Sequence, residues 1–150
     1  MAGLFAKGTA LWVGDDTSPP IYTKIANVKS ISGPDINVTV VDTTTHSTVG
    51  NFREKAAVLI DAGQVGFEIN FDPDDPTLDP TASNTLWDNC VNLRTRSYQL
   101  RLAPSNVGNE MMVFNGFVTK HGFMFPVDNV QTCNMTIDID GEPIWDTFTP

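Results

Sequence analysis

The chain has 150 residues, of which 18 are acidic and 9 are basic, so its formal net charge is −9. This length is typical of one domain and lets a chain bury about 68–70% of its unfolded surface, so we expect one domain over residues 1–150 that folds without a metal or disulfide. The acidic balance argues against a protein that grips nucleic-acid phosphates through clustered Lys and Arg, and against adhesion to an anionic membrane surface.

The first half of the chain consists of short apolar runs between turns. Gly and Pro together make up 21 residues and are spread along the chain, which indicates a β-rich domain. Leu11–Val13 and Ile25–Ile31 are expected to be strands with loose patterns, and Ile36–Val41 a Val-rich strand. The periodicity of Phe52–Ile60 fits a strand or a helix. Gln64–Phe71 alternates apolar and polar residues, which predicts a half-buried strand.

One helix is predicted, over about residues 80–93. Asp79 can cap this helix, and Pro80 suits its first turn. An apolar stripe at helical spacing follows, made of Leu86, Trp87, Cys90, Val91 and Leu93.

The second half of the chain returns to strand patterns. Ser97–Leu102 alternates, with Gln99 and Arg101 expected to face outward. Met111–Val118 is apolar on both faces, so we expect it to be covered on both sides. Thr132–Asp140 alternates throughout. Many strands and one helix predict a mainly β fold, a β-sandwich or barrel with one flanking α-helix.

We find no motif for catalysis or metal binding, and we expect no enzyme activity, no metal and no cofactor. The densest acidic patch, Asp72–Asp79, fails the EF-hand pattern because Thr77 and Ser83 stand where Gly and Glu are required. We interpret it as a solvated connection, with a cation site as the alternative. Cys90 and Cys133 are expected to be buried free thiols, with a disulfide as the alternative.

The titratable residues outside this patch carry little catalytic signal. His46 and His121 have no Cys, His or Asp neighbour at metal-ligand spacing. A hydrolase that uses Glu68 or Asp140 is one hypothesis, but nothing in the sequence brings the two carboxylates together.

A polar, β-branched segment, Val41–Gly50, separates two apolar runs. It is either a long hairpin connection or an arm that orders against a neighbouring subunit. The following residues, Asn51–Lys55, hold two of the nine basic groups. Three further cations, Arg94, Arg96 and Arg101, are candidates for pairing with acidic groups of another copy, or equally within the subunit.

Six segments of the chain follow one another in the order of a known family. They are Gly8–Asp15 with its Leu-Trp-Val run, Ile25–Pro34, Asp61–Phe71, Ser97–Pro104 with Tyr-x-Leu-Arg-Leu, Met112–Lys120 with Phe-x-Gly-x-Val, and Val130–Ile144. Each motif alone is weak, but the ordered set resembles the tail tube proteins of long-tailed, lambda-like bacteriophages. That family is related in fold to the inner tube of type VI secretion.

The resemblance implies a structural virion protein without catalytic residues. Hexameric rings would stack into a hollow tail tube that delivers the genome, assembled in the host bacterial cytoplasm. Strands of neighbouring subunits would form a continuous barrel wall. The implied partners are further copies of the chain and the tape measure, tail terminator and distal tail proteins, while DNA passes without specific binding and no membrane is involved. The loop to the next ring would be Asp42, Thr43, Thr44, Thr45, His46, Ser47, Thr48, Val49, Gly50, Asn51, Phe52, Arg53, Glu54 and Lys55.

A tube through which DNA slides suggests a use for the negative charge. A negative lumen wall would repel phosphates, and Glu68, Asp138 and Asp140 on polar strand faces are candidates for that wall. The alternative function is a β-sandwich binding module, such as a phage decoration or carbohydrate-recognition domain. In that case Trp12 or Trp145 would be exposed stacking platforms.

Overall fold

The computed structural model describes residues 8–47, 49–102 and 109–148, and Thr48 of the predicted loop lies outside them. The described chain is mainly β, with antiparallel strands and one short helix, as predicted. The elements are β1 Ala10–Gly14, β2 Tyr22–Lys24, β3 Val28–Ser32, β4 Asn37–Asp42, β5 Lys55–Asp61, β6 Gln64–Asn70, α1 Leu86–Val91, β7 Arg96–Arg101, β8 Glu110–Met124 and β9 Thr132–Thr147. No helix in these ranges is long and apolar enough to cross a membrane.

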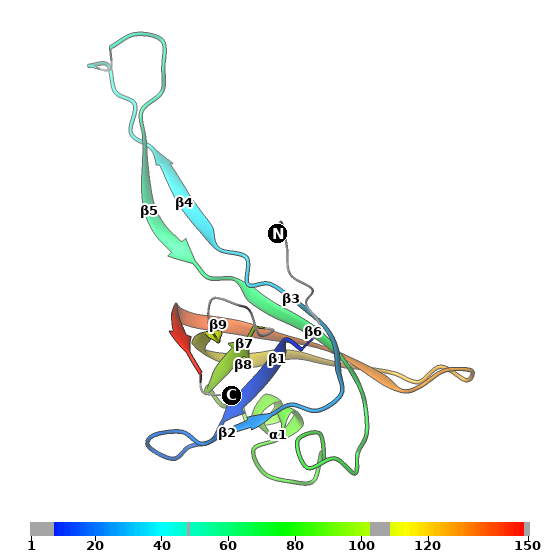
Figure 1. The fold of residues 1–150 in the computed structure, drawn as a ribbon. Helices are drawn as coiled ribbons and strands as arrows, with labels where there is room; N and C mark the ends of the chain where they lie inside the picture. Colours follow the sequence, from blue (N-terminus) through cyan, green and yellow to red (C-terminus); the bar gives the residue numbers. More distant parts are fainter. Residues whose placement is uncertain (1–7, 48, 103–108, 149–150) are drawn as a thin grey trace.

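A three-residue connection brings the two edges of the main sheet together. Seven strands pair in the order β2-β1-β7-β8-β9-β6-β3, so β2 and β3 lie at opposite edges although they are consecutive in sequence. The N–H of Ile25 donates to the carbonyl of Leu11 in β1 over 3.0 Å, and the N–H of Asn70 in β6 donates to the carbonyl of Asn27 over 3.0 Å. From Ile25 to Asn27 the chain advances two residues, which span at most about 7 Å. The two edges of the sheet must therefore come together, so the sheet rolls up into a β-sandwich-like body (Figure 1).

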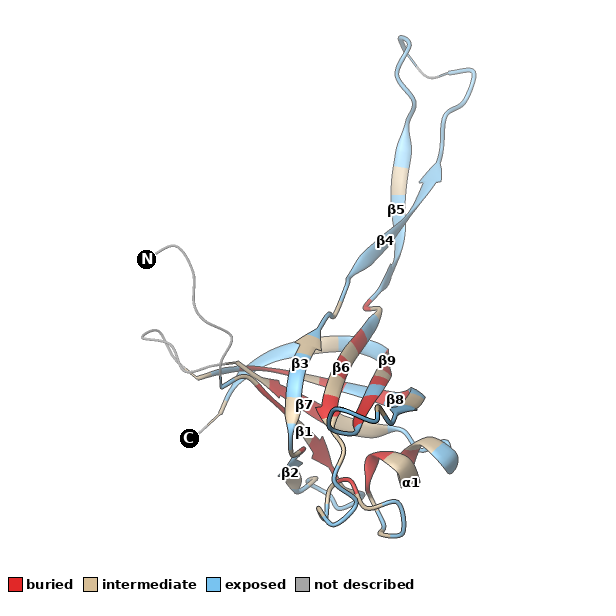
Figure 2. Ribbon diagram, turned by 90° about the vertical axis from the view of Figure 1, so that its right-hand side faces the viewer, coloured by how far each residue is buried: buried red, intermediate tan, exposed pale blue. Residues whose placement is uncertain are grey.

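The hydrophobic core fills the inside of this rolled sheet. Figure 2 shows buried residues along β6, β7, β8 and β9 in the body. The alternation predicted for β6 and β9 is confirmed: Val65, Phe67, Ile69, Cys133, Met135, Ile137 and Ile139 are all buried. Both cysteines are free, Cys133 in the core and Cys90 half-buried. Burial raises the pKa of the Cys133 thiol to about 11, which leaves it an inert apolar side chain.

Several strand predictions need correction. Ile25–Ile31 is not one strand, because its first residues form the connection between the sheet edges. Gln99, expected to face outward, is buried. Its side-chain oxygen accepts two hydrogen bonds from Arg101, which compensate for the loss of water. The apolar run of β8 is not covered on both sides, because Phe117 is 37% exposed. The segment Phe52–Ile60, which fitted either element, contains most of strand β5.

The predicted helix over residues 80–93 is wrong at both ends. The helix begins after Thr85, whose side chain accepts a hydrogen bond from the N–H of Asp88. Asn84 has a φ of 56° and Leu93 a φ of 54°, and such left-handed residues interrupt a helix on either side. Asp79, the predicted cap, instead caps the turn at Thr81.

The apolar stripe predicted for the helix is only partly buried. Leu86 lies in the core, and Trp87 and Cys90 are half-buried, while Val91 and Leu93 are 52% and 86% exposed. The helix is therefore too short to bury the whole stripe. It packs mainly against β8.

Strands β4 and β5 form a separate two-stranded hairpin, which we call the arm. It projects away from the body (Figure 1), and Figure 2 shows it almost entirely exposed. Its strands pair from Asn37 with Asp61 at the base to Asp42 with Lys55 at the far end, with a β-bulge between Thr39 and Val40.

Two glycines hold the arm on the body. Gly33 follows β3 and Gly63 follows β5, with φ values of 89° and 77°. A Cβ on Gly33 would lie 2.3 Å from the carbonyl oxygen of Gln64, and one on Gly63 would lie 2.4 Å from that of Asp35. The two chain segments therefore cross at backbone contact, which only glycine permits.

We expect Gly63→Ala to destabilise the protein more than Gly141→Ala. Both positions are left-handed, so each variant loses about 1–2 kcal/mol to backbone strain. Only Gly63 also has a backbone oxygen in the way, whereas nothing lies within 4 Å of a Cβ on Gly141. Urea denaturation of the two variants measures the difference. Equal midpoints would show that the crossing at the arm base is not tightly constrained.

Candidate assembly surfaces

The arm exposes a large apolar surface. Every residue of β4 is exposed, and so is all of β5 except the half-buried Ala56. The exposed apolar side chains of the arm strands are Val38, Val40, Val41, Val58, Leu59 and Ile60. An isolated two-stranded hairpin is at best marginally stable in water, and an exposed apolar patch usually marks an interaction site. The arm therefore has the properties of an interface that is not yet covered.

The predicted inter-subunit loop, Asp42–Lys55, lies at the far end of the arm. Its sides are held together by hydrogen bonds from the N–H of Thr43 to the carbonyl of Glu54 over 2.9 Å and from the N–H of Glu54 to the hydroxyl of Thr44 over 2.8 Å. Arg53 lies 3.5 Å from Asp42 and is 77% exposed. That this loop contacts another subunit stays a prediction.

The three predicted lumen carboxylates share one sheet face. Glu68 lies opposite Asn134 and Gln64 lies opposite Asp138, so β6 and β9 present their polar residues on the same outer side. Asp140 continues this alternation in β9. We call this surface the polar face: Ser30, Ser32, Gln64, Gly66, Glu68, Asn134, Thr136, Asp138 and Asp140. Its location in an assembly stays a prediction.

Charge on the polar face is partly compensated within the subunit. The ammonium of Lys29 lies 3.8 Å from the carboxylate of Glu68, and both side chains are substantially exposed. A pair of this kind contributes little to stability but reduces the local negative potential. Because Gly66 has no side chain, the middle of the face is a shallow hollow of about 260 Å³.

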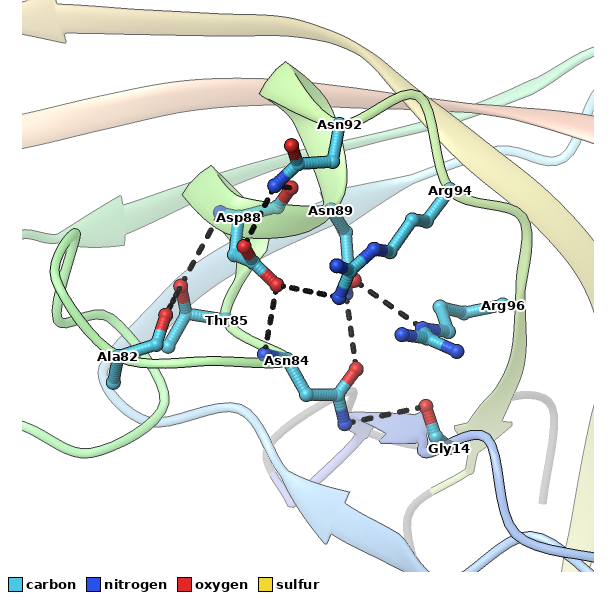
Figure 3. A network of polar contacts seen from close by, with 9 residues as sticks. All are labelled: Gly14, Ala82, Asn84, Thr85, Asp88, Asn89, Asn92, Arg94 and Arg96. Atoms are coloured by element: carbon cyan, nitrogen blue, oxygen red, sulfur yellow. Dashed lines mark hydrogen bonds and ion pairs between the residues drawn. The ribbon is translucent and has the colours of Figure 1, made fainter.

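The three arginines proposed for pairing with another copy all have partners within the subunit. Arg94 forms an ion pair of 2.9 Å with Asp88, and Arg96 donates to the side-chain oxygen of buried Asn89 over 3.2 Å. Figure 3 shows these contacts as one network that ties α1 to the start of β7. Arg101 donates to Gln99 and stacks at 3.9 Å on the ring of Trp12. Pairing between copies stays a prediction for these residues.

The other end of that network reaches β1. Asn84 donates its backbone N–H to the carboxylate of Asp88 over 3.0 Å, and its side-chain amide lies 3.5 Å from the carbonyl of Gly14. The amide of Asn89 donates to the side-chain oxygen of Asn84 over 3.3 Å (Figure 3). The short helix is thus fixed by buried polar contacts as well as by its packing on β8.

The structure keeps the possible catalytic carboxylates apart. Glu68 lies opposite Asn134, which is six residues before Asp140 in β9, a separation of about 20 Å. Glycosidase carboxylates lie about 5–9.5 Å apart, so these two do not form such a pair. In the acidic connection Asp72–Asp79, carboxylates instead accept hydrogen bonds from nearby backbone N–H groups. No group of three possible metal ligands occurs among the described residues.

One tryptophan proposed as a stacking platform is covered and the other is exposed. The guanidinium of Arg101 covers the ring of Trp12, whose indole nitrogen is buried. Trp145, in contrast, is 59% exposed. It lines a groove at the base of the arm together with residues of β5, β8 and β9. The sequence has no signal for this groove because its walls come from segments far apart along the chain.

An aromatic cluster lies between α1 and the far half of β8. It contains Phe71, Trp87, His121, Phe123 and Phe125. The ring of His121 lies edge-on to Trp87 at 5.3 Å and 4.7 Å from Phe123. Its Nδ1 is buried without a hydrogen-bond partner among the described residues. Burial lowers the pKa of His121 below its ordinary value of 6.5.

We expect His121 to make the free energy of unfolding pH-dependent. Its folded-state pKa is lower than its unfolded-state pKa, so the unfolded chain binds the proton more readily. The stability contribution is complete above about pH 6.5 and is lost as the pH falls from there toward the folded-state pKa. Chemical denaturation between pH 7.5 and 5 measures this loss, and His121→Phe removes it. A profile unchanged in the variant would contradict the assignment.

Comparisons with known proteins support the fold. The chain matches no protein-family model. No curated protein matches its sequence. A protein in the virion of a native gene transfer agent particle is similar in structure, with a TM-score of 0.71 and 14% identity over 97% of this chain and 100% of that one. A protein in the tail of an empty gene transfer agent particle with C6 symmetry gives 0.69 and 16%, again over 97% and 100%.

A third similar structure comes from an extracellular contractile injection system. A protein in the PVC sheath–tube complex in its extended state has a TM-score of 0.65 and 18% identity, over 98% of this chain and 93% of that one. In fold, the chain is therefore like proteins of phage-like tails, as the sequence resemblance implies. These similarities cover the projecting arm as well as the body, since nearly the whole chain is matched.

Proposed function

We propose that this protein is a structural tail protein that polymerises into stacked hexameric rings, which form a hollow tube for genome delivery. The observation that carries the proposal is the arm, a two-stranded hairpin whose valine, leucine and isoleucine side chains face solvent. An isolated two-stranded hairpin is at best marginally stable in water, so burial against another chain would stabilise this surface. Nothing in this role requires a catalytic residue or a cofactor.

The six-fold arrangement is supported by similarity of fold. One similar protein belongs to a gene transfer agent tail with C6 symmetry. A free strand edge supports lateral contact between copies: β9 pairs with β6 only as far as Asp138, so within the described residues its last part, Asp140–Thr147, pairs with β8 alone. Neighbouring copies would pair such edges, which closes a barrel wall and leaves no edge for aggregation.

The proposed tube has the polar face toward its lumen. A sheet with one face on the core and one face solvated suits a wall between subunit interior and water. Glu68, Asp138 and Asp140 would give that wall a negative potential that repels DNA phosphates. Small polar neighbours such as Ser30 and Thr136 offer no bulky side chain to obstruct the duplex.

Deleting Thr43–Gly50 should leave a folded subunit that does not polymerise. The deletion removes the end of the arm and leaves the core of the body intact. Electron microscopy of both proteins at high concentration should show rings or tubes of uniform diameter only for the full chain. Circular dichroism checks the fold of the deletion variant. Tubes from the variant at the same concentration would contradict the role of the arm.

A wild-type chain that stays strictly monomeric and binds a ligand would instead favour the β-sandwich binding module. Trp145 is the exposed aromatic residue that such a module would use. Sedimentation velocity over a range of concentrations distinguishes the two functions.

Charge reversal on the polar face should change how tubes treat DNA. In Asp138→Lys with Thr136→Lys, tubes should still form, but linear duplex DNA should be retained in them at low salt, because cations in the lumen attract phosphates. Cosedimentation of labelled DNA with tubes measures this. Asp16→Lys, in the exposed turn after β1, is the control for added positive charge. Equal DNA retention in variant and control would show that the polar face does not line the lumen.

A further inference from the structure

An apolar groove of about 740 Å³ opens at the base of the arm, between the arm and the last part of β9. Met112 and Ile139 of the body line it, and Val58–Ala62 of the arm forms one wall. The opposite wall includes Trp145, which is 59% exposed. Tryptophan is enriched among the residues that dominate protein interfaces, so this position is suited to bind another chain.

The rim of this groove is acidic. Four carboxylates lie around Trp145: Asp61 and Glu142 along the groove, and Glu110 and Asp146 along a neighbouring hollow of about 300 Å³. The ion pairs found in the described part of the chain include none of the four. Arg101, two strands away, is engaged by its own contacts. The surface therefore suits an occupant that combines apolar side chains with positive charge.

The far end of the arm has this complementary chemistry. The segment Val49–Lys55 carries two cations and one carboxylate. Val49 and Phe52 are 92% and 86% exposed, which is extreme for apolar side chains. Arg53 remains 77% exposed although Asp42 lies 3.5 Å away. The segment offers an aromatic ring and an arginine that are adjacent in sequence, and the ring of Phe52 has no aromatic or cationic partner among the described residues.

A subunit cannot place this segment in its own groove. The arm side of the groove begins at Val58, whereas Lys55 is the first residue of β5 and the rest of the segment precedes it. At about 3.3 Å per residue in an extended chain, Phe52 lies about 20 Å from Val58 along the arm. The hydrogen-bonded ladder keeps the hairpin extended, so the occupant must come from another molecule.

We propose that the Trp145 surface, with its four carboxylates, receives the Val49–Lys55 segment of a neighbouring copy. The inference rests on the proposed function and identifies the surface that one arm meets during assembly. Phe52 packs in the groove against Trp145, and Arg53 and Lys55 pair with the carboxylates around Trp145, including Glu110 and Asp146 of the neighbouring hollow, Arg53 also over the indole face. The contact joins two different surfaces, so it is head-to-tail and propagates from copy to copy into rings or filaments.

A charge-swap experiment tests this contact in the full-length protein. Arg53→Glu with Lys55→Glu places like charges against the rim and should raise the concentration needed for tube formation at least tenfold. Adding Glu110→Arg and Asp146→Arg to the same chain should restore assembly to within about threefold of wild type, because the pairing is re-formed with its sign exchanged. All four positions are exposed, so the variants should fold. Lys120→Glu, which reverses an exposed cation outside both surfaces, is the control for charge reversal elsewhere on the subunit.

Trp145→Ala should weaken assembly by a similar factor through loss of the ring that covers Phe52. Light scattering and electron microscopy give the critical concentration for each variant. Arm variants that assemble like the Lys120→Glu control would overturn the contact, and so would failure of the four-residue swap to rescue, since the arm would then meet another surface or another protein. In those cases wild-type tubes still form, whereas a wild-type chain without any assembly would overturn the proposed function as well.

Discussion

The connection Ile25–Asn27 is the constraint on which the rest of the fold depends. It joins β2 and β3, the opposite edges of a seven-stranded sheet, and bonds to β1 at one end and to β6 at the other. Three residues cannot span a flat sheet of this width, so the sheet must roll up. Rolling encloses apolar side chains of β1, β6, β7, β8 and β9 in one core, and Val28 and Ile31 of β3 pack against it. The body is thereby closed by its own backbone, and both cysteines are free.

The arm lies outside the closed core of the body. After β3 the chain leaves the sheet at Gly33 and returns at Gly63, and the two passing segments touch through their backbones. No arm residue contributes to the buried core beyond Ala62 at the base. The stable core and the exposed apolar surface therefore lie in different parts of the subunit. Body packing provides stability, whereas the arm presents apolar surface that its own subunit leaves exposed.

The rolled fold gathers the acidic side chains at particular places, so the negative charge is not uniform over the surface. Part of it caps turns in the connection before α1, and Asp88 pairs with Arg94, which holds the helix. A further part lies on two surfaces that the rolled sheet creates, the polar face and the surface around Trp145. The few exposed cations include those at the end of the arm. The acidic surface around Trp145 and the cations at the end of the arm are complementary in charge.

Local patterns in the sequence predicted the features that depend on neighbouring residues. Alternation predicted the buried faces of β6 and β9 and put Glu68, Asp138 and Asp140 on the polar faces of their strands, because successive side chains of a strand point in opposite directions. Composition predicted that the polar, β-branched segment Val41–Gly50 is a hairpin connection or an arm. Three features came from the tertiary structure alone: Ile25 begins a crossing between sheet edges, α1 starts at Leu86, and Trp145 shares a groove with β5. These features arise from contacts between segments far apart in the chain, which no local pattern encodes.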